Sequence, residues 1–177
     1  MLTLVRDRRY LVNTLILCLL WSTSAYSFYF TEFFMKYVPV SNIYYLALLL
    51  GTSDILTNLT FGLLNQRLPT KTTLILSTFL LTISALLLSM GLPLQGLTVI
   101  GLRFFSALTF IAVYYANNEY FPTLLKGAIF AVTNVVARLA SVLSPVVAEG
   151  LSNPTVTVAL AAGAACIASV RLSKISE

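Results

Sequence analysis

The sequence predicts an all-α membrane protein with six transmembrane helices, and three observations support this fold class. Hydrophobic residues make up 58% of the 177 residues and charged residues only 10%, whereas roughly 25% of the residues in soluble proteins are charged. The mean hydropathy is +0.90. The apolar residues also form runs of about 20, which is the length that crosses a bilayer as a helix.

Six apolar segments follow one another along the chain and define the predicted spans. Each connection between them contains a proline or a glycine, which are the residues that most often interrupt helices. No linker or low-complexity tract divides the chain, so we expect one domain over residues 1–177. The spans cover residues 11–34, 43–64, 72–90, 97–116, 123–148 and 155–170.

The first segment has some features of a secretory signal. Three arginines precede an apolar run that reaches Ala25, which is the layout of a cleavable signal peptide. The apolar character continues to Phe34, however, and this makes the segment long enough to span a bilayer. We therefore expect a retained first helix.

The basic residues between the spans predict the orientation. With the N-terminus inside, eight of them fall on the inner side and only Lys36 on the outer side. This bias places both termini on the cytoplasmic or matrix side, and it accounts for the formal charge of +5 without a nucleic-acid partner. The inner residues are Arg6, Arg8, Arg9, Arg67, Lys71, Lys126, Arg171 and Lys174.

Three charged residues within the spans are candidate binding residues. Arg138 lies fifteen residues into the fifth span, and Asp54 lies twelve residues into the second, or ~18 Å at helical rise. Arg103 is seven residues into the fourth span, so it either snorkels to the outer interface or faces a cavity. Charges as deep as Asp54 and Arg138 normally face protein or a water-filled cavity.

These three charges allow two interpretations. Asp54 and Arg138 would form an ion pair that only fixes helix packing, or the residues would bind a ligand at the midplane. Two arginines against one aspartate leave an excess of positive charge, which favours a small organic anion. We therefore predict Arg138, Arg103 and Asp54 as substrate-binding residues.

The last two spans carry small residues that favour close helix packing. The sixth has six alanines and a glycine between Ala159 and Ala168. One face of the fifth has Gly127, Ala131, Ala137, Ser141, Ser144 and Ala148.

Enzymatic chemistry finds little support in the sequence. It contains no histidine, and its two cysteines, Cys18 and Cys166, lie inside apolar segments without metal-ligand or disulfide spacing. A catalytic triad and a phosphate-binding glycine loop are also missing. We expect neither a cofactor nor a metal.

Several short motifs resemble the C-terminal half of the organic anion/cation transporters of the major facilitator superfamily. The stretch Glu119-Tyr120-Phe121-Pro122-Thr123, followed by Lys126, is similar to the family's E-L-Y-P-T turn and its basic residue. The charged, small and proline residues of the next helix are matched by Arg138, Ala140 and Pro145. Further similarities are Trp21 with Phe28-Tyr29, Asn42-Ile43-Tyr44 with Gly51 and Asp54, and Gly101-Leu102-Arg103-Phe104.

The resemblance implies a six-helix half of a major facilitator fold. In the family's anion-handling members the position that matches Arg138 is basic, whereas cation-handling members carry an acid there. The resemblance also implies an inner gate formed by Glu119, Lys126 and Arg67. The loop around Arg67 departs from the family's D-R-x-G-R-R pattern, because Asn65 replaces the acid and the glycine is missing.

Two functions follow as alternatives. A major facilitator site lies between two six-helix halves, so this half would pair with an identical chain or with a separate N-terminal half and transport a small organic anion. Alternatively, the chain is a non-transporting accessory subunit of a larger membrane complex, for example in the mitochondrial inner membrane. A fragment of a longer transporter is a third possibility.

Overall fold

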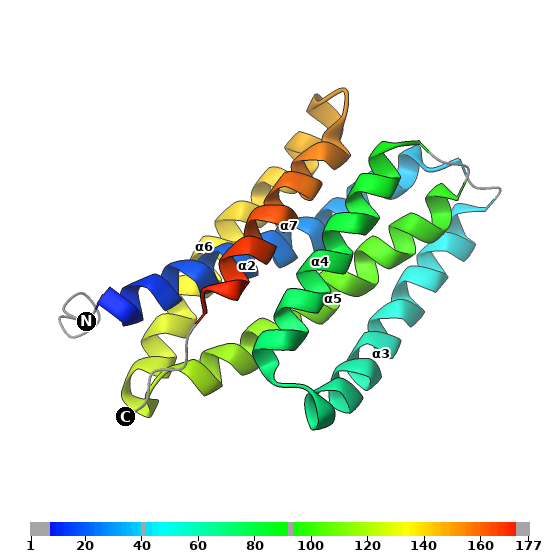
Figure 1. Cartoon of the computed structure of the whole chain (residues 1–177). Helices are drawn as coiled ribbons and strands as arrows, with labels where there is room; N and C mark the ends of the chain where they lie inside the picture. Colours follow the sequence, from blue (N-terminus) through cyan, green and yellow to red (C-terminus); the bar gives the residue numbers. More distant parts are fainter. Residues whose placement is uncertain (1–7, 40–41, 92–93, 173–177) are drawn as a thin grey trace.

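The computed structural model describes residues 8–39, 42–91 and 94–172, which fold into a bundle of α-helices (Figure 1). Five of these helices are long and apolar enough to cross a membrane, and the last one is apolar but shorter. The predicted all-α class is therefore confirmed, and each predicted span corresponds to a helix. The helices are α2 (Arg8–Phe34), α3 (Ile43–Arg67), α4 (Thr70–Ser89), α5 (Gln95–Tyr120), α6 (Thr123–Gly150) and α7 (Pro154–Val170), with a short 3₁₀ helix, η1 (Met35–Tyr37), after α2.

The helix boundaries follow local chemistry. Asn42 precedes α3, and its side-chain oxygen accepts hydrogen bonds from the backbone N–H groups of Tyr44 and Tyr45, as expected of an N-cap. Pro122 has an extended backbone immediately before α6, and Pro154 is the first residue of α7. The missing N–H of a proline has no helical partner at such a position.

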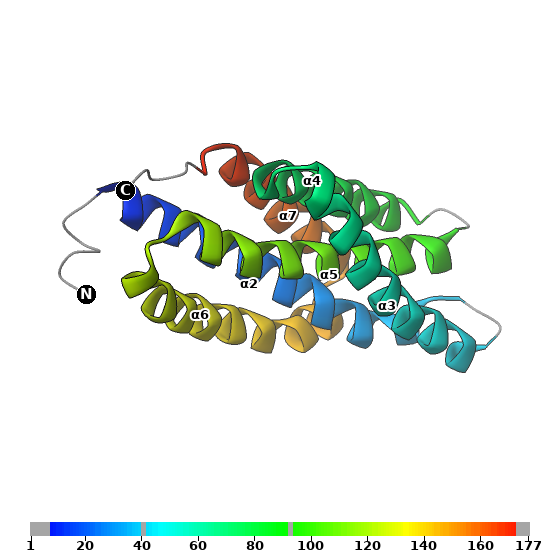
Figure 2. The ribbon, with the colours of Figure 1, turned by 90° about the horizontal axis from the view of Figure 1, so that it is seen from below.

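Successive helices alternate in direction, so the connections lie at two ends of the bundle. The end at which α2 begins and α7 ends, here called the terminal end, also carries the α3–α4 and α5–α6 connections (Figures 1 and 2). Of the predicted inner residues, Arg6 and Lys174 lie outside the described residues, and the other six lie at the terminal end. Lys36 lies at the opposite end, where it contacts Glu149. The side of the membrane that the terminal end faces stays a prediction.

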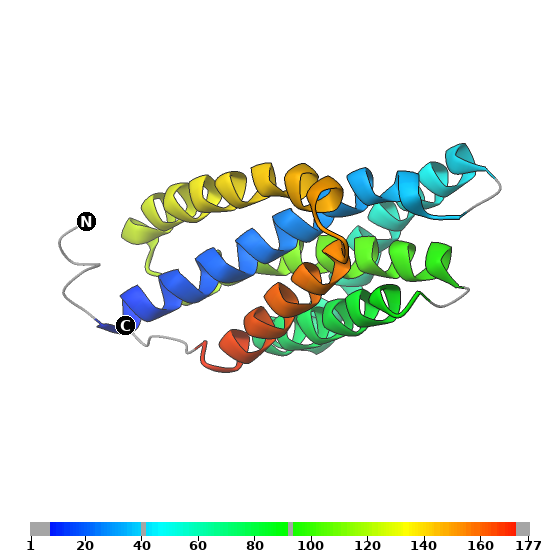
Figure 3. The ribbon, with the colours of Figure 1, turned by 90° about the horizontal axis from the view of Figure 1, so that it is seen from above.

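The packing order relates the first three helices to the last three. The main neighbours of α2 are α5, α6 and α7, and those of α5 are α2, α3 and α4, while α4 packs against α7. Figure 3 shows α2 between α6 and α7. The same pairs result when each helix of the first three is exchanged with its counterpart in the last three, that is, α2 with α5, α3 with α6 and α4 with α7. Because α2 and α5 run in opposite directions (Figure 1), the two groups of three helices have matching neighbours and opposite orientations.

Two peripheral helices, α3 and α6, leave broad apolar faces uncovered. Less of each is buried inside the bundle than of the other long helices. Such a continuous apolar surface is suited to lipid or to a protein partner. On α3 the exposed residues include Leu48, Ile55, Leu59 and Leu63, and on α6 Val135, Leu139, Val142 and Val146.

The predicted small-residue faces are confirmed for α7 and in part for α6. Ala159, Ala162 and Ala165 are buried, and α7 packs closely against α4. On α6, Ala137, Ser144 and Ala148 of the predicted face are buried, whereas Gly127 and Ala131 are exposed, because Ile129 and Thr133 take the buried positions in the first half of this helix. The buried residues of α6 are Ile129, Thr133, Ala137, Ser144 and Ala148.

Candidate functional site

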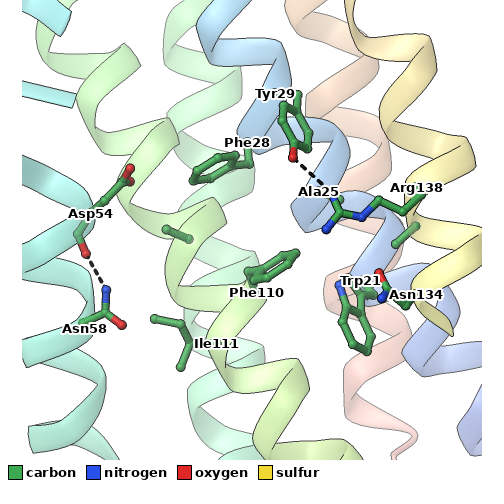
Figure 4. Close-up of a pocket in the computed structure, with 12 residues that line it drawn as sticks. Trp21, Ala25, Phe28, Tyr29, Asp54, Asn58, Phe110, Ile111, Asn134 and Arg138 are labelled. Atoms are coloured by element: carbon green, nitrogen blue, oxygen red, sulfur yellow. Dashed lines mark hydrogen bonds between the residues drawn. The ribbon is translucent and has the colours of Figure 1, made fainter. Parts of the chain in front are cut away.

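A cavity of about 330 Å³ lies between α2, α3, α5 and α6, roughly halfway along these helices (Figure 4). Four of its twelve lining residues are aromatic, and the polar groups come mainly from α3 and α6. Two of the three predicted substrate-binding residues, Asp54 and Arg138, line this cavity. The lining residues are Trp21, Ala25, Phe28, Tyr29, Asp54, Asn58, Ala107, Phe110, Ile111, Asn134, Ala137 and Arg138.

Arg138 enters the cavity from α6, on the opposite side from Asp54 (Figure 4). The preceding residue, Ala137, is buried against the bundle. Arg138 therefore lies at the edge of the buried face of α6. The Arg138 Nη1 donates a hydrogen bond to the Tyr29 hydroxyl at 3.1 Å. No carboxylate of the described residues lies within ion-pair distance of Arg138, so its positive charge is not compensated locally.

Asp54 pairs with Arg103 rather than with Arg138. The Nε and Nη2 atoms of Arg103 donate to the two Asp54 carboxylate oxygens at 3.0 and 2.9 Å. This bidentate geometry is the strongest form of ion pair between these residue types. The alternative interpretation, in which Asp54 pairs with Arg138, is therefore excluded, because the Asp54 carboxylate points at Arg103 of α5.

Arg103 does not snorkel to an interface. Only 7% of the residue is exposed, and its guanidinium lies 3.2 Å from the centre of the Phe28 ring, a cation–π contact. Its Nη1 donates to the Phe28 carbonyl oxygen and to the Glu32 carboxylate, both at 3.1 Å. The donors of Arg103 are thus directed at protein groups, and the residue lies behind the cavity wall rather than in it. We call Glu32, Asp54 and Arg103 the Arg103 cluster.

Glu32 is the charged residue that sequence reasoning missed. It lies within the first predicted span, so an acid inside an apolar run was the available signal. With Glu32 included, two arginines face two carboxylates, and the predicted excess of positive charge is wrong. The charges are instead separated: the Arg103 cluster carries a formal charge of −1, and Arg138 carries +1.

A rigid aromatic group forms one wall of the cavity. Trp21 is 1% exposed, and its ring packs against Phe110, Tyr114 and Phe130 with centroid distances of 5.9, 4.6 and 5.0 Å. Sequence reasoning treated Trp21 only as part of a family motif. An aromatic wall beside a cation suits a ligand that combines an anionic group with an apolar body.

Two amides add neutral hydrogen-bonding groups to the cavity. Asn134 lies one turn before Arg138 on α6, and Asn58 lies one turn after Asp54 on α3. The Asn58 Nδ2 donates to the Asp54 backbone carbonyl at 2.8 Å. Neither asparagine was predicted as a site residue, because a single amide in an apolar segment carries no distinctive pattern.

The residues of the predicted inner gate share the terminal end of the bundle. Arg67 is the last residue of α3, Glu119 is next to last in α5, and Lys126 lies in the first turn of α6. The gate itself stays a prediction.

Comparison with known proteins does not assign this chain to a family. No family model matches the sequence, and no curated protein matches it.

Proposed function

We propose that the chain is a half-unit of a membrane transporter, which pairs with a second six-helix unit and binds a small organic anion at Arg138. The single observation that carries this proposal is that Arg138 lines the cavity without a carboxylate partner among the described residues. It is a cation midway along an apolar helix, it lines a cavity, and its described hydrogen-bond partner is the neutral Tyr29 hydroxyl. A cation in such a position is costly unless it has a function or a counter-ion.

The helix arrangement supports the transporter class. Inverted repeats of three helices occur within each six-helix half of major facilitator transporters, and the present packing order has this character. The motif resemblance around Glu119 and Arg138 agrees with it. Transporters of this class carry their substrate between two halves, so a lone half needs a partner.

The exposed helices suggest where the partner binds. The cavity is bordered by α3 and α6, which are also the helices with the most exposed apolar faces. A second unit that packs on these two helices would close the cavity and shelter Arg138 from lipid. An identical chain and a separate half both fit this description.

The proposal can be tested through Trp21, because it is the only tryptophan in the sequence and it lines the cavity. We expect benzoate to cause a saturable change in its fluorescence in the lipid-reconstituted complex, while neutral benzamide causes none. The two compounds share the ring and differ in charge, so the comparison isolates the anionic group. If benzoate, acetate and inorganic phosphate all leave the fluorescence unchanged, anion binding at this site is refuted.

One observation favours the alternative of an accessory subunit. Three of the four charges discussed above belong to the Arg103 cluster, which ties α2, α3 and α5 together, and this is a packing role. Native mass spectrometry of the detergent-extracted complex separates the two functions. A transporter half-unit is expected with one further six-helix unit, whereas an accessory subunit is expected with a fixed set of unrelated membrane proteins.

A further inference from the structure

We propose that the face between α3 and α6 binds a second copy of this chain, in the same membrane orientation and related to the first copy by a two-fold axis parallel to the helices. The inference rests on the proposed function, because it names the partner that closes the cavity of the same site. It is carried by a match between the polar residues of α3 and those of α6, which lie at the same levels of the bundle.

The face that borders the cavity is too polar to meet lipid. Asp54 and Asn58 line the cavity from α3, and Asn134 and Arg138 line it from α6 (Figure 4). Asn58 and Arg138 are exposed, and the other two are only partly buried. Such groups halfway along apolar helices are costly in hydrocarbon. A partner that covers this face must therefore offer polar groups of its own at the same level.

On each of these helices the polar residues belong to a row that also contains small residues. A spacing of three or four positions places the members of a row on one side of the helix. The α3 row is Gly51, Asp54, Asn58, Gly62 and Asn65. The α6 row is Gly127, Ala131, Asn134, Arg138 and Ser141.

The glycines of these rows are not explained by packing within one copy. A side-chain carbon added at Gly51, Gly62 or Gly127 would meet no neighbouring group of the described chain within 4 Å. Glycine inside a helix is unfavourable relative to alanine, but in a membrane it allows a second helix to approach closely. The space beside the rows is therefore suited to helices of a partner.

A two-fold axis parallel to the helices brings the two rows together. Rotation about such an axis places α3 of one copy opposite α6 of the other, and α6 of the first opposite α3 of the second. The contact is antiparallel, because α3 and α6 run in opposite directions within the bundle (Figure 1). An interface of this kind uses the same face of both copies, as in most symmetric dimers.

The polar residues of the two rows lie at matching levels. α3 begins and α6 ends at the end of the bundle opposite to the terminal end. At helical rise, Asp54 lies about 17 Å from the start of α3, and Arg138 lies about 18 Å from the end of α6. The corresponding values for Asn58 and Asn134 are about 23 and 24 Å. In the dimer the aspartate of one copy is thus level with the arginine of the other, and asparagine is level with asparagine.

The remaining members of the rows follow the same register. Gly62 comes opposite Ala131 of the other copy, so small residues face each other where the helices approach. Gly51 likewise comes opposite Ser141, and Asn65 comes opposite Gly127.

This self-complementarity identifies the partner as a second copy. The Arg103 cluster, with its formal charge of −1, lies beside the α3 row, and Arg138 supplies +1 in the α6 row. The two-fold axis therefore places opposite charges across the interface twice. A partner of unrelated sequence gives no reason for α3 and α6 of this chain to complement each other. The second copy also closes the cavity, so each copy contributes α3 to the site of the other.

The main experiment is disulfide cross-linking between two copies in the membranes of the producing cell. Both copies carry Cys18→Ala and Cys166→Ala; one also carries Gly62→Cys and the other Ala131→Cys, each with its own tag. A disulfide requires Cα atoms within about 7 Å of each other, so it forms only where the two rows meet. We expect an oxidised product of doubled mass that carries both tags.

Two controls test the register and the specificity of this product. Gly51→Cys lies in the same row as Gly62→Cys but about 17 Å away along the helix, so it should not link to Ala131→Cys. Ile167→Cys lies on α7, outside the proposed face, and is 69% exposed, so it reports random collisions. If Gly62→Cys gives no product, or if all three cysteines link equally to Ala131→Cys, the inference is refuted.

A second measurement does not depend on cysteine chemistry. Gly62→Ile adds a side chain where a single copy has open space, so the helices should form as before while the second copy is obstructed. We expect roughly tenfold weaker self-association, measured by energy transfer between labelled copies that are diluted in liposomes. The matched control is Leu63→Ile, which alters the next residue, 65% exposed, and should associate as the wild type does. Equal association of Gly62→Ile and the wild type contradicts the proposal.

These outcomes are separate from those of the proposed function. If the cross-links form in the expected register but benzoate leaves the Trp21 fluorescence unchanged, the dimer stands and the anion site fails. If benzoate binds and no cross-link forms, the inference is refuted, and the anion site stands with a separate half-unit as its partner.

Discussion

Replacement of Arg103 by methionine is expected to destabilise the folded protein by about 3–5 kcal/mol, which is the usual cost of removing one partner from a buried ion pair. The variant would leave Asp54 and Glu32 as two carboxylates without their shared counter-ion. It would also remove the cation from the Phe28 ring. Methionine fills a similar volume, so a cavity contributes little to the effect. Thermal unfolding of the purified protein in detergent, followed by circular dichroism, measures the loss.

Two further variants show whether this cost comes from the unpaired acids. Adding Asp54→Asn and Glu32→Gln to Arg103→Met should recover most of the stability, because a network that is replaced as a whole leaves no buried charge. Lys36→Met is the matched control, since it breaks an ion pair that is exposed on both sides, and surface pairs contribute little. An Arg103→Met variant as stable as the wild type would contradict the structural role of the cluster.

Replacement of Arg138 by glutamine is expected to weaken anion binding roughly 10- to 150-fold, because hydrogen bonds to a charged group contribute about 1.5–3 kcal/mol to binding. The fold should remain intact, since Arg138 is exposed and its described side-chain contact is the Tyr29 hydroxyl. The Trp21 fluorescence titration with benzoate measures the affinity, and circular dichroism checks the helices.

The control for this prediction is Arg171→Gln. It removes an exposed arginine just after α7, outside the cavity, and should bind benzoate as the wild type does. Equal affinities for the Arg138→Gln variant and the wild type would remove Arg138 from the site. A transport assay in the complete complex should then show the same ranking, with uptake lost for Arg138→Gln and retained for Arg171→Gln.

Much of the fold could be predicted because it depends on local properties of the chain. The apolar runs define the helices, and Asn42, Pro122 and Pro154 stand where helices begin. The alternation of helices then carries the basic residues to one end. Helix faces were harder to predict, as Gly127 and Ala131 show: small residues mark a possible contact line, but the neighbouring helix selects the one that is used.

The site was predicted in part. Depth within an apolar segment identified Asp54, Arg103 and Arg138 as residues that need protein around them, and two of them line the cavity. Their partners were not predictable from depth. Glu32 was missed because it lies near the end of its helix, where an acid is not unusual, and Tyr29 and Asn134 carry no charge that would single them out.

The sequence by itself determined the membrane class, the number and order of the helices and the segregation of basic residues, since these follow from hydropathy, helix breakers and loop composition. Only the tertiary structure decided that Asp54 and Glu32 share Arg103 while Arg138 faces a cavity. The reason is physical: ion pairing depends on how each helix is rotated and which helices are neighbours, and these are set by the packing of the whole bundle.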